Sequence, residues 1–212
     1  MRVKNWMKHS LICAATLCFG NSAWATDLLF DNLNSPTQLR DSVHDFGPLS
    51  DSFSTGAGAF TLMEVKVLLD SRDPASQGSI VLDVVDDNAN HPGSLLTNVG
   101  ALNDQALTNS PAVYDFVLSA PVALAANTRF WLQISEGVNP TAAQWFWSDD
   151  LKALGVAGEF YAGNGGVFSN EALPGPWQMQ LLGTASPVPL PPSVLMLGSI
   201  LGCLGLRHRC RY

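Results

Sequence analysis

Two short stretches of this chain alternate their side chains with a period of two, which is the pattern of a β-strand with one face buried. The predicted inward-facing residues are Phe130, Leu132 and Ile134 in TRFWLQIS, and Trp177, Met179 and Leu181 in WQMQLLG. Clusters of Gly, Pro, Asn and Asp separate these runs from their neighbours, as turns do. A chain with this pattern is restricted to a sheet-based fold.

Seven further short runs predict strands. They are Leu28–Leu33, Asp51–Ser54, Phe60–Leu69, Ile80–Val85, Val113–Leu118, Gln144–Trp147 and Gly158–Tyr161. Nine short strands predict an all-β fold, an antiparallel β-sandwich of jelly-roll type, and only Leu151–Val156 suggests a helix. We expect one domain over residues 26–186, which is long enough to bury about 70% of its unfolded surface.

The charged residues are divided unevenly along the chain. All 18 acidic residues lie between Asp27 and Glu171 with only five of the 11 basic residues, so this part carries a net charge of −13. Because such an acidic body repels phosphate groups, we expect no nucleic-acid partner. All four cysteines lie near the two ends of the chain, which excludes disulfides, cysteine zinc sites and a cysteine nucleophile from the body.

Residues 1–25 have the three-part pattern of a secretory signal peptide. A basic stretch precedes the apolar run Leu11–Gly20, and Ala23-Trp24-Ala25 follows. Small residues at Ala23 and Ala25 are what signal peptidase reads, so we expect cleavage after Ala25. The apolar run is too short for a membrane anchor, which needs about 20 residues.

Residues 187–212 combine prolines, a short apolar run and a basic end. The apolar run Val194–Leu206 would rise about 20 Å as a helix, against about 30 Å of hydrocarbon. Arg207, Arg209 and Arg211 follow it and would orient this end toward the cytoplasm as a basic stop. The prolines before it favour an extended segment that a protease can bind. The alternative is the tail anchor of a periplasmic protein.

The order of these parts resembles the PEP-CTERM sorting signals that exosortases process in Gram-negative bacteria. The matching motif is Val188, Pro189, Leu190, Pro191 and Pro192. Leu190 stands where the commonest signal has Glu, which is closer to the VPLPA-type variant, and Pro192 stands where that variant has Ala. The resemblance implies an exosortase-like partner, a transient inner-membrane intermediate, and a final location at the cell surface or in the extracellular matrix.

The body resembles the choice-of-anchor domains, most nearly type R. The landmarks, in order, are FDNL, DSFSTG, LMEVKVLL, VVDDNANHPGSLL, YDFVLSAPVALAANTRFWLQIS, WFWSDD and WQMQLLGTAS. Together they span most of residues 26–186. The resemblance implies a β-rich extracellular module and supplies no catalytic residues.

The segment DVVDDNANHPG has two interpretations. Its candidate calcium ligands are Asp83, Asp86, Asp87, Asn88 and Asn90, with His91 beside them. Calcium takes six to eight oxygen ligands, but the spacing does not fit an EF-hand loop. The same residue types are typical of a hairpin turn, which is the favoured interpretation. No other cofactor is predicted.

The segment WFWSDD also has two interpretations. Trp145 and Trp147 share one side of a predicted strand, where exposed rings would stack on sugars while Asp149 and Asp150 bond hydroxyls. Tryptophan rings are more often buried, so core packing is favoured.

No catalytic motif is present in the body. It has no GxSxG elbow, P-loop, HExxH or GxGxxG pattern, and its histidines are His44 and His91. The adjacent Asp149 and Asp150 would point to opposite faces of a strand, unlike a glycosidase pair. We therefore expect a non-enzymatic surface or matrix protein with a structural or adhesive role in exopolysaccharide or biofilm. A carbohydrate-binding module is the alternative.

Overall fold

The computed structural model describes residues 26–148, 162–164, 167–169 and 175–186. The strands are β1 (Asp27–Asp31), β2 (Thr37–Ser42), β3 (Leu49–Ser54), β4 (Phe60–Ser71), β5 (Ser79–Asp87), β6 (Pro92–Asn103), β7 (Ala112–Leu124), β8 (Arg129–Glu136), β9 (Ala143–Ser148), β10 (Ala162–Asn164), β11 (Val167–Ser169) and β12 (Met179–Ala185). One helical turn, α1 (Val43–Phe46), and one 3-10 turn, η1 (Asp104–Ala106), join strands.

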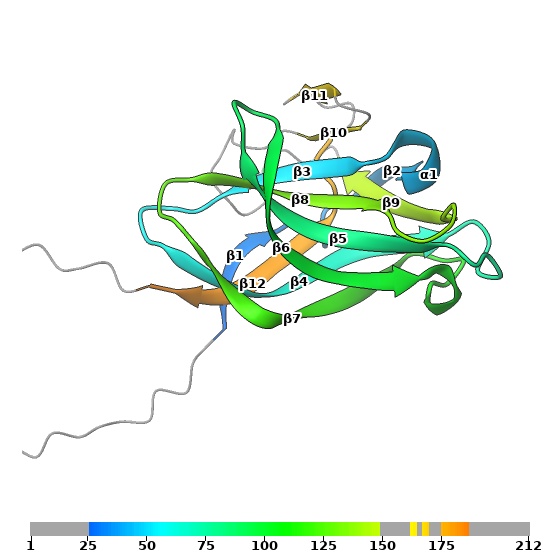
Figure 1. Cartoon of the computed structure of the whole chain (residues 1–212), viewed down its shortest axis with the longest axis horizontal. Helices are drawn as coiled ribbons and strands as arrows, with labels where there is room; N and C mark the ends of the chain where they lie inside the picture. Colours follow the sequence, from blue (N-terminus) through cyan, green and yellow to red (C-terminus); the bar gives the residue numbers. More distant parts are fainter. Residues whose placement is uncertain (1–25, 149–161, 165–166, 170–174, 187–212) are drawn as a thin grey trace, which may run out of the picture.

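The strands form two six-stranded sheets that face each other (Figure 1). Sheet A has the order β1-β12-β4-β9-β2, and β7 also pairs with β4; sheet B has the order β11-β10-β3-β8-β5-β6. All these strand pairs are antiparallel. Apolar side chains from both sheets meet in one core. The described part is therefore all-β and β-sandwich-like, as predicted, while the jelly-roll connectivity stays a prediction.

The two alternating stretches form strands whose predicted faces enter the core. Phe130, Leu132 and Ile134 of β8 are buried in the core cluster, and so are the inward-facing residues at and just before β12. Trp131, on the other face of β8, is also fully buried, and its indole Nε1 donates to Asp87 Oδ1 at 2.9 Å. Strict alternation therefore predicts which face enters the core but not whether the second face is covered.

The sequence did not predict β2 and β6. Seven of the 12 residues of the edge strand β6 are exposed. The other edge strand, β2, reads TQLRDS and has little apolar content. Edge strands of this kind need few core residues, so their sequences carry little alternation. The predicted strand Gly158–Tyr161 and the predicted helix Leu151–Val156 lie outside the described residues.

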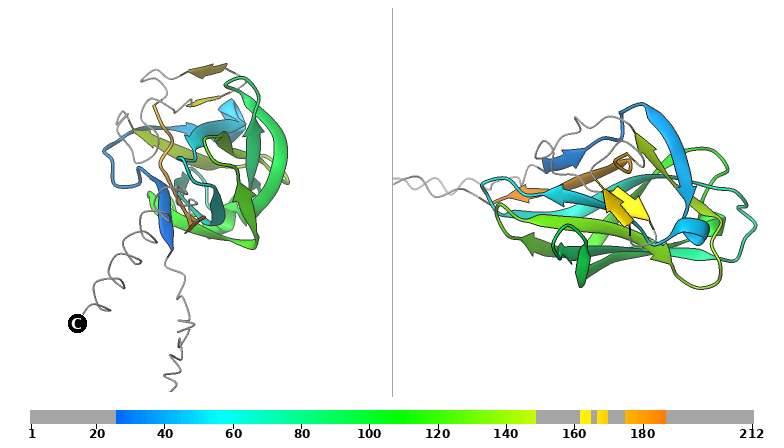
Figure 2. Two further views of the ribbon diagram at one scale, coloured as in Figure 1. Left: turned by 90° about the vertical axis from the view of Figure 1, so that its left-hand side faces the viewer. Right: turned by 90° about the horizontal axis from the view of Figure 1, so that it is seen from above.

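The two ends of the sandwich differ in what they contain (Figures 1 and 2). At one end, which we call the terminal pole, β1 begins, β12 ends, and the loops 55–59 and 125–128 turn back into the sheets. At the other end, the opposite pole, lie α1, η1 and the loops 72–78 and 137–142. The first and last strands pair directly, with Asp27 opposite Gly183.

Candidate functional site

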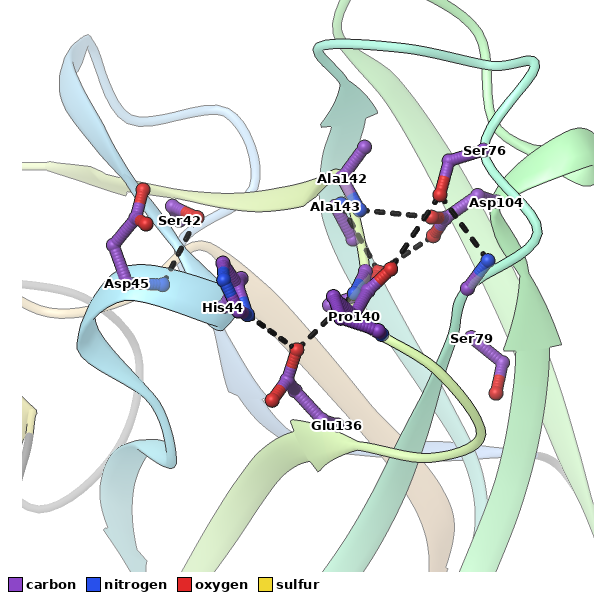
Figure 3. Close-up of polar contacts among 12 residues, drawn as sticks. Ser42, His44, Asp45, Ser76, Ser79, Asp104, Glu136, Pro140, Ala142 and Ala143 are labelled. Atoms are coloured by element: carbon purple, nitrogen blue, oxygen red, sulfur yellow. Dashed lines mark hydrogen bonds and ion pairs between the residues drawn. The ribbon is translucent and has the colours of Figure 1, made fainter.

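A group of interacting polar side chains lies at the opposite pole (Figure 3). We call it the polar cluster. Its members are Ser42, His44, Asp45, Arg72, Asp104, Glu136 and Thr141. They come from five separate segments, so the cluster exists only when the sheets are packed together.

Asp104 forms the inner layer of the polar cluster. Its side chain is fully buried at the start of η1, and its two carboxylate oxygens accept from the Thr141 hydroxyl at 2.5 Å and the Ala142 N–H at 2.8 Å. The Asp104 N–H donates to the Gly78 carbonyl at 3.0 Å. One carboxylate therefore joins η1 to the β8–β9 loop, while its backbone joins η1 to the loop before β5.

Glu136 and His44 form the outer layer. Glu136 Oε1 accepts from the Thr141 N–H at 3.1 Å and lies 2.8 Å from His44 Nδ1. Both side chains are partly exposed, 46% for His44 and 38% for Glu136. The pair therefore connects α1 to the end of β8 at the protein surface.

Arg72 completes the cluster beside α1. The Ser42 hydroxyl caps the helical turn by accepting the Asp45 N–H at 3.2 Å. The Arg72 guanidinium donates to the Ser42 hydroxyl at 2.8 Å and to Asp45 Oδ2 at 2.9 Å. The Ser42 side chain, followed by Arg72, lowers the pKa of Asp45 below its ordinary value. These contacts therefore favour the charged form of the Asp45 carboxylate.

The chemistry of this cluster is that of a fixed hydrogen-bond network. A carboxylate beside an imidazole is one part of a general-base arrangement, which also needs a hydroxyl or thiol within hydrogen-bond reach of the histidine. Within the described part of the chain, the hydrogen-bond partner of His44 is Glu136. The geometry therefore supports positioning of loops, and the non-enzymatic interpretation stays a prediction.

The predicted hairpin turn is present at Asn88–His91. Asn88 and His91 exchange backbone hydrogen bonds of 2.8 and 3.2 Å, and the two central residues have positive φ, 53° at Ala89 and 67° at Asn90. Two successive positive φ values are what a two-residue type I′ hairpin requires. The favoured interpretation of this segment therefore agrees with the structure.

The candidate calcium ligands in this hairpin contact other protein groups. The partners are Asn98 for Asp83, the Ser94 N–H for Asp86, Trp131 for Asp87, and Arg129 for Asn90. Among the described residues, no three His, Cys, Asp or Glu side chains gather in a possible metal-binding group. Calcium binding stays a prediction, and an ion here would compete with these protein donors.

The two tryptophans of WFWSDD lie in the core. Trp145 is 0% and Trp147 is 4% exposed, and the Trp145 ring stacks on Trp177 with centroids 5.3 Å apart. The Trp145 Nε1 donates to the Gln178 carbonyl at 3.1 Å. This is the favoured core interpretation, and it corrects the sugar-stacking alternative, because neither buried ring has a face that a sugar can reach. Asp149 and Asp150 lie outside the described residues.

One ionisable residue in the core is Asp51 of β3. It lies on the same face as Leu49 and Phe53, and within the described part neither carboxylate oxygen has a hydrogen-bond partner. Burial raises the pKa of Asp51 well above its ordinary value of 3.8, although the nearby backbone of Trp177 and Ser52 opposes part of this rise. Burial therefore disfavours the charged form of this carboxyl in the folded protein.

Sequence reasoning did not find the polar cluster. Asp104 lies in η1, Glu136 at the end of β8 and Thr141 in the β8–β9 loop, and no local sequence motif marks any of them. The cluster could have been predicted only if the order of the strands in the two sheets had been known, because that order decides which segments share one end of the sandwich.

The remaining predicted sites lie outside the described residues. These are the signal-cleavage residues Ala23 and Ala25, the motif 188–192 and the arginines 207, 209 and 211. Within the described ranges, no helix is both long and apolar enough to cross a membrane. Comparison with protein-family models finds no match to the chain, and comparison with curated proteins finds no significant relative.

Proposed function

We propose that this chain is an exported, non-enzymatic surface or extracellular-matrix protein of a Gram-negative bacterium. Signal peptidase removes residues 1–25, and residues 187–212 hold the protein in the inner membrane until an exosortase-like transpeptidase releases or transfers it. The body is a jelly-roll-type module of the choice-of-anchor kind. Its role is structural or adhesive, within exopolysaccharide or biofilm.

The observation that carries this proposal is the three-part order of the last 26 residues, from Pro187 to Tyr212. The end of the folded body supports it, because β12 ends at Ala185, directly before the motif. Pairing of β1 with β12 brings the first and last strands of the body together at one pole. A sorting signal at this position would be separate from the sandwich rather than part of its core.

Intact mass spectrometry of the protein from membrane and extracellular fractions of its native host tests the proposal. We expect residues 1–25 to be missing and a new C-terminus within Val188–Pro192. A double variant, Pro189→Ala with Pro191→Ala, should lose this cleavage, whereas the exposed-loop control Pro111→Ala should keep it. An intact Tyr212, found only in membranes, would leave a tail-anchored periplasmic protein instead.

A carbohydrate-binding module remains the second candidate, on a different surface from the one predicted. Phe46 of α1 is 49% exposed and is the one exposed aromatic ring among the side chains that the structure describes. Phe46 belongs to the same helical turn as His44, so an exposed apolar ring and an exposed polar side chain are both available on α1. Binding of the protein to host exopolysaccharide tests this function. It is favoured if Phe46→Ala abolishes binding while Phe53→Leu, in the core, leaves binding intact.

A further inference from the structure

The two loops of the terminal pole are built from small, uncharged residues. They read TGAGA over residues 55–59 and AANT over residues 125–128, and Gly56, Ala57, Ala125 and Asn127 are exposed there. Neither loop contains an acidic or basic residue, although residues 26–186 carry 18 acidic side chains. The two loops are therefore uncharged, whereas Asp27 of β1 and Arg129 of β8 lie beside them at the same pole.

The C-terminal end of the body is held firmly against this pole. The Ser186 N–H donates to the Ala59 carbonyl at 2.8 Å, and Ala185 lies opposite Phe60 in the sheet. The Ala185 N–H also donates to Asp27 Oδ2 at 2.9 Å. The two loops are joined in turn, because the Asn127 N–H donates to the Gly56 carbonyl at 2.8 Å. Ser186 is therefore a fixed point from which the remaining chain starts.

The reach of the chain beyond Ser186 is short. An extended chain covers at most about 3.3–3.6 Å per residue. Val188 is therefore within about 7 Å of Ser186, and Pro192 is within about 22 Å. The apolar run begins at Val194, within about 29 Å of Ser186. These are upper limits that hold for any conformation of the connecting residues.

We propose that the terminal pole is a contact surface for the membrane-bound enzyme that cleaves the chain, an inference that rests on the proposed function. An active site that cleaves between Val188 and Pro192 has to work within about 22 Å of Ser186. Because the cleavage site is this close to the pole, the enzyme residues around the active site contact loops 55–59 and 125–128. Small neutral residues suit this contact, because they permit close approach of the backbone and bring no charge that must lose its water.

Charged substitutions in the two loops test the contact in the full chain, expressed in its native host. Ala57→Glu with Ala125→Glu should slow appearance of the cleaved product about fivefold in a pulse-chase experiment, because both charges would be desolvated or repelled at the contact. The matched control, Ala75→Glu with Val138→Glu, adds the same charge to exposed positions at the opposite pole and should keep the wild-type rate. Equal melting temperatures for the purified variants would exclude misfolding.

A spacer and a change of sign complete the experiment. Twelve Gly and Ser residues inserted after Ser186 should restore the wild-type rate to the glutamate variant, because the cleavage site then lies away from the pole. Ala57→Lys with Ala125→Lys should slow cleavage as the glutamates do.

Three outcomes would overturn the inference. The first is a wild-type rate for the glutamate pair, and the second is no rescue by the spacer. The third is faster cleavage of the lysine pair, which would assign the effect to the anionic lipid surface. A wild-type chain that is never cleaved would instead refute the proposed function itself.

Discussion

The two poles of this sandwich hold their loops in different ways. At the opposite pole, charged and hydroxyl side chains connect the loops, with Asp104 fully buried between η1 and Thr141. At the terminal pole, loops 55–59 and 125–128 are joined mostly through backbone groups of small residues, with the Thr55 hydroxyl as the main side-chain link between them. The first pole depends on particular side chains, whereas the second depends on close approach of the backbone. Removing a side chain should therefore damage one pole, and adding a side chain should damage the other.

The largest effect should come from removing the central carboxylate of the polar cluster. Asp104→Ala leaves the Thr141 hydroxyl and the Ala142 N–H without their acceptor. We expect the free energy of unfolding to fall by about 2–4 kcal/mol, measured by urea denaturation. Asp104→Asn, which keeps one acceptor oxygen, should lose less. Equal losses for both variants would contradict the assigned hydrogen bonds.

The terminal pole should be broken by a single added methyl group. A Cβ at Gly183 would lie 1.9 Å from the Thr61 carbonyl oxygen and 2.6 Å from the Phe60 ring. We expect Gly183→Ala to reduce the free energy of unfolding by about 1–3 kcal/mol. Gly56→Ala, at a position with no heavy atom within 4 Å of the added Cβ, is the matched control and should have almost no effect. Thermal unfolding measures the difference. If both variants have the melting temperature of the wild type, this pole is not closely packed.

Between the poles, Asp51 should make stability depend on pH. The pKa of Asp51 in the folded protein lies above the unfolded value near 3.8. Ionisation of Asp51 therefore does not lower the free energy of unfolding below about pH 3.8, and lowers it increasingly as the pH rises toward the folded pKa. Asp51→Asn should therefore raise the free energy of unfolding at pH 7 by about 1–2 kcal/mol and change it little at pH 3.5. Denaturation curves at both pH values measure this difference. A variant that is destabilised at pH 7 would indicate that the ionised carboxylate has a favourable partner.

The smallest effect should come from the outer layer of the polar cluster. The His44–Glu136 pair is partly exposed, and pairs of this kind contribute little. We expect His44→Gln to change the free energy of unfolding by at most about 0.5 kcal/mol in urea denaturation. A loss as large as that of Asp104→Ala would place the strength of this pole at its surface rather than at its buried carboxylate.

The sequence predicted the sheets better than the poles. Alternation located β8 and the residues around β12 because each contributes a full row of core side chains. It did not locate β2 or β6, whose edge positions require few such residues. The tryptophans were correctly assigned to the core as the favoured interpretation, because large apolar rings are seldom left in water.

The candidate site could not be predicted for a different reason. His44 of α1, Asp104 of η1 and Glu136 of β8 belong to one cluster only because these elements lie at the same end of the sandwich. The topology of the sheets brings these residues together, and their spacing along the sequence does not indicate that they are close. The hairpin at Asn88–His91 could be predicted because its geometry depends on neighbouring residues alone.

The direct pairing of β12 with β4 also has a mechanical consequence for a body held through Ser186. If a load is applied at the opposite pole, tension runs along the strands between that pole and Ser186. The hydrogen bonds between antiparallel strands lie perpendicular to the strands, so such tension loads them in shear and they share the force. Seven residues of β12, from Met179 to Ala185, are paired with β4. In a body attached in this way, the hydrogen bonds between β12 and β4 have to break together rather than one after another, so the body resists a larger pulling force.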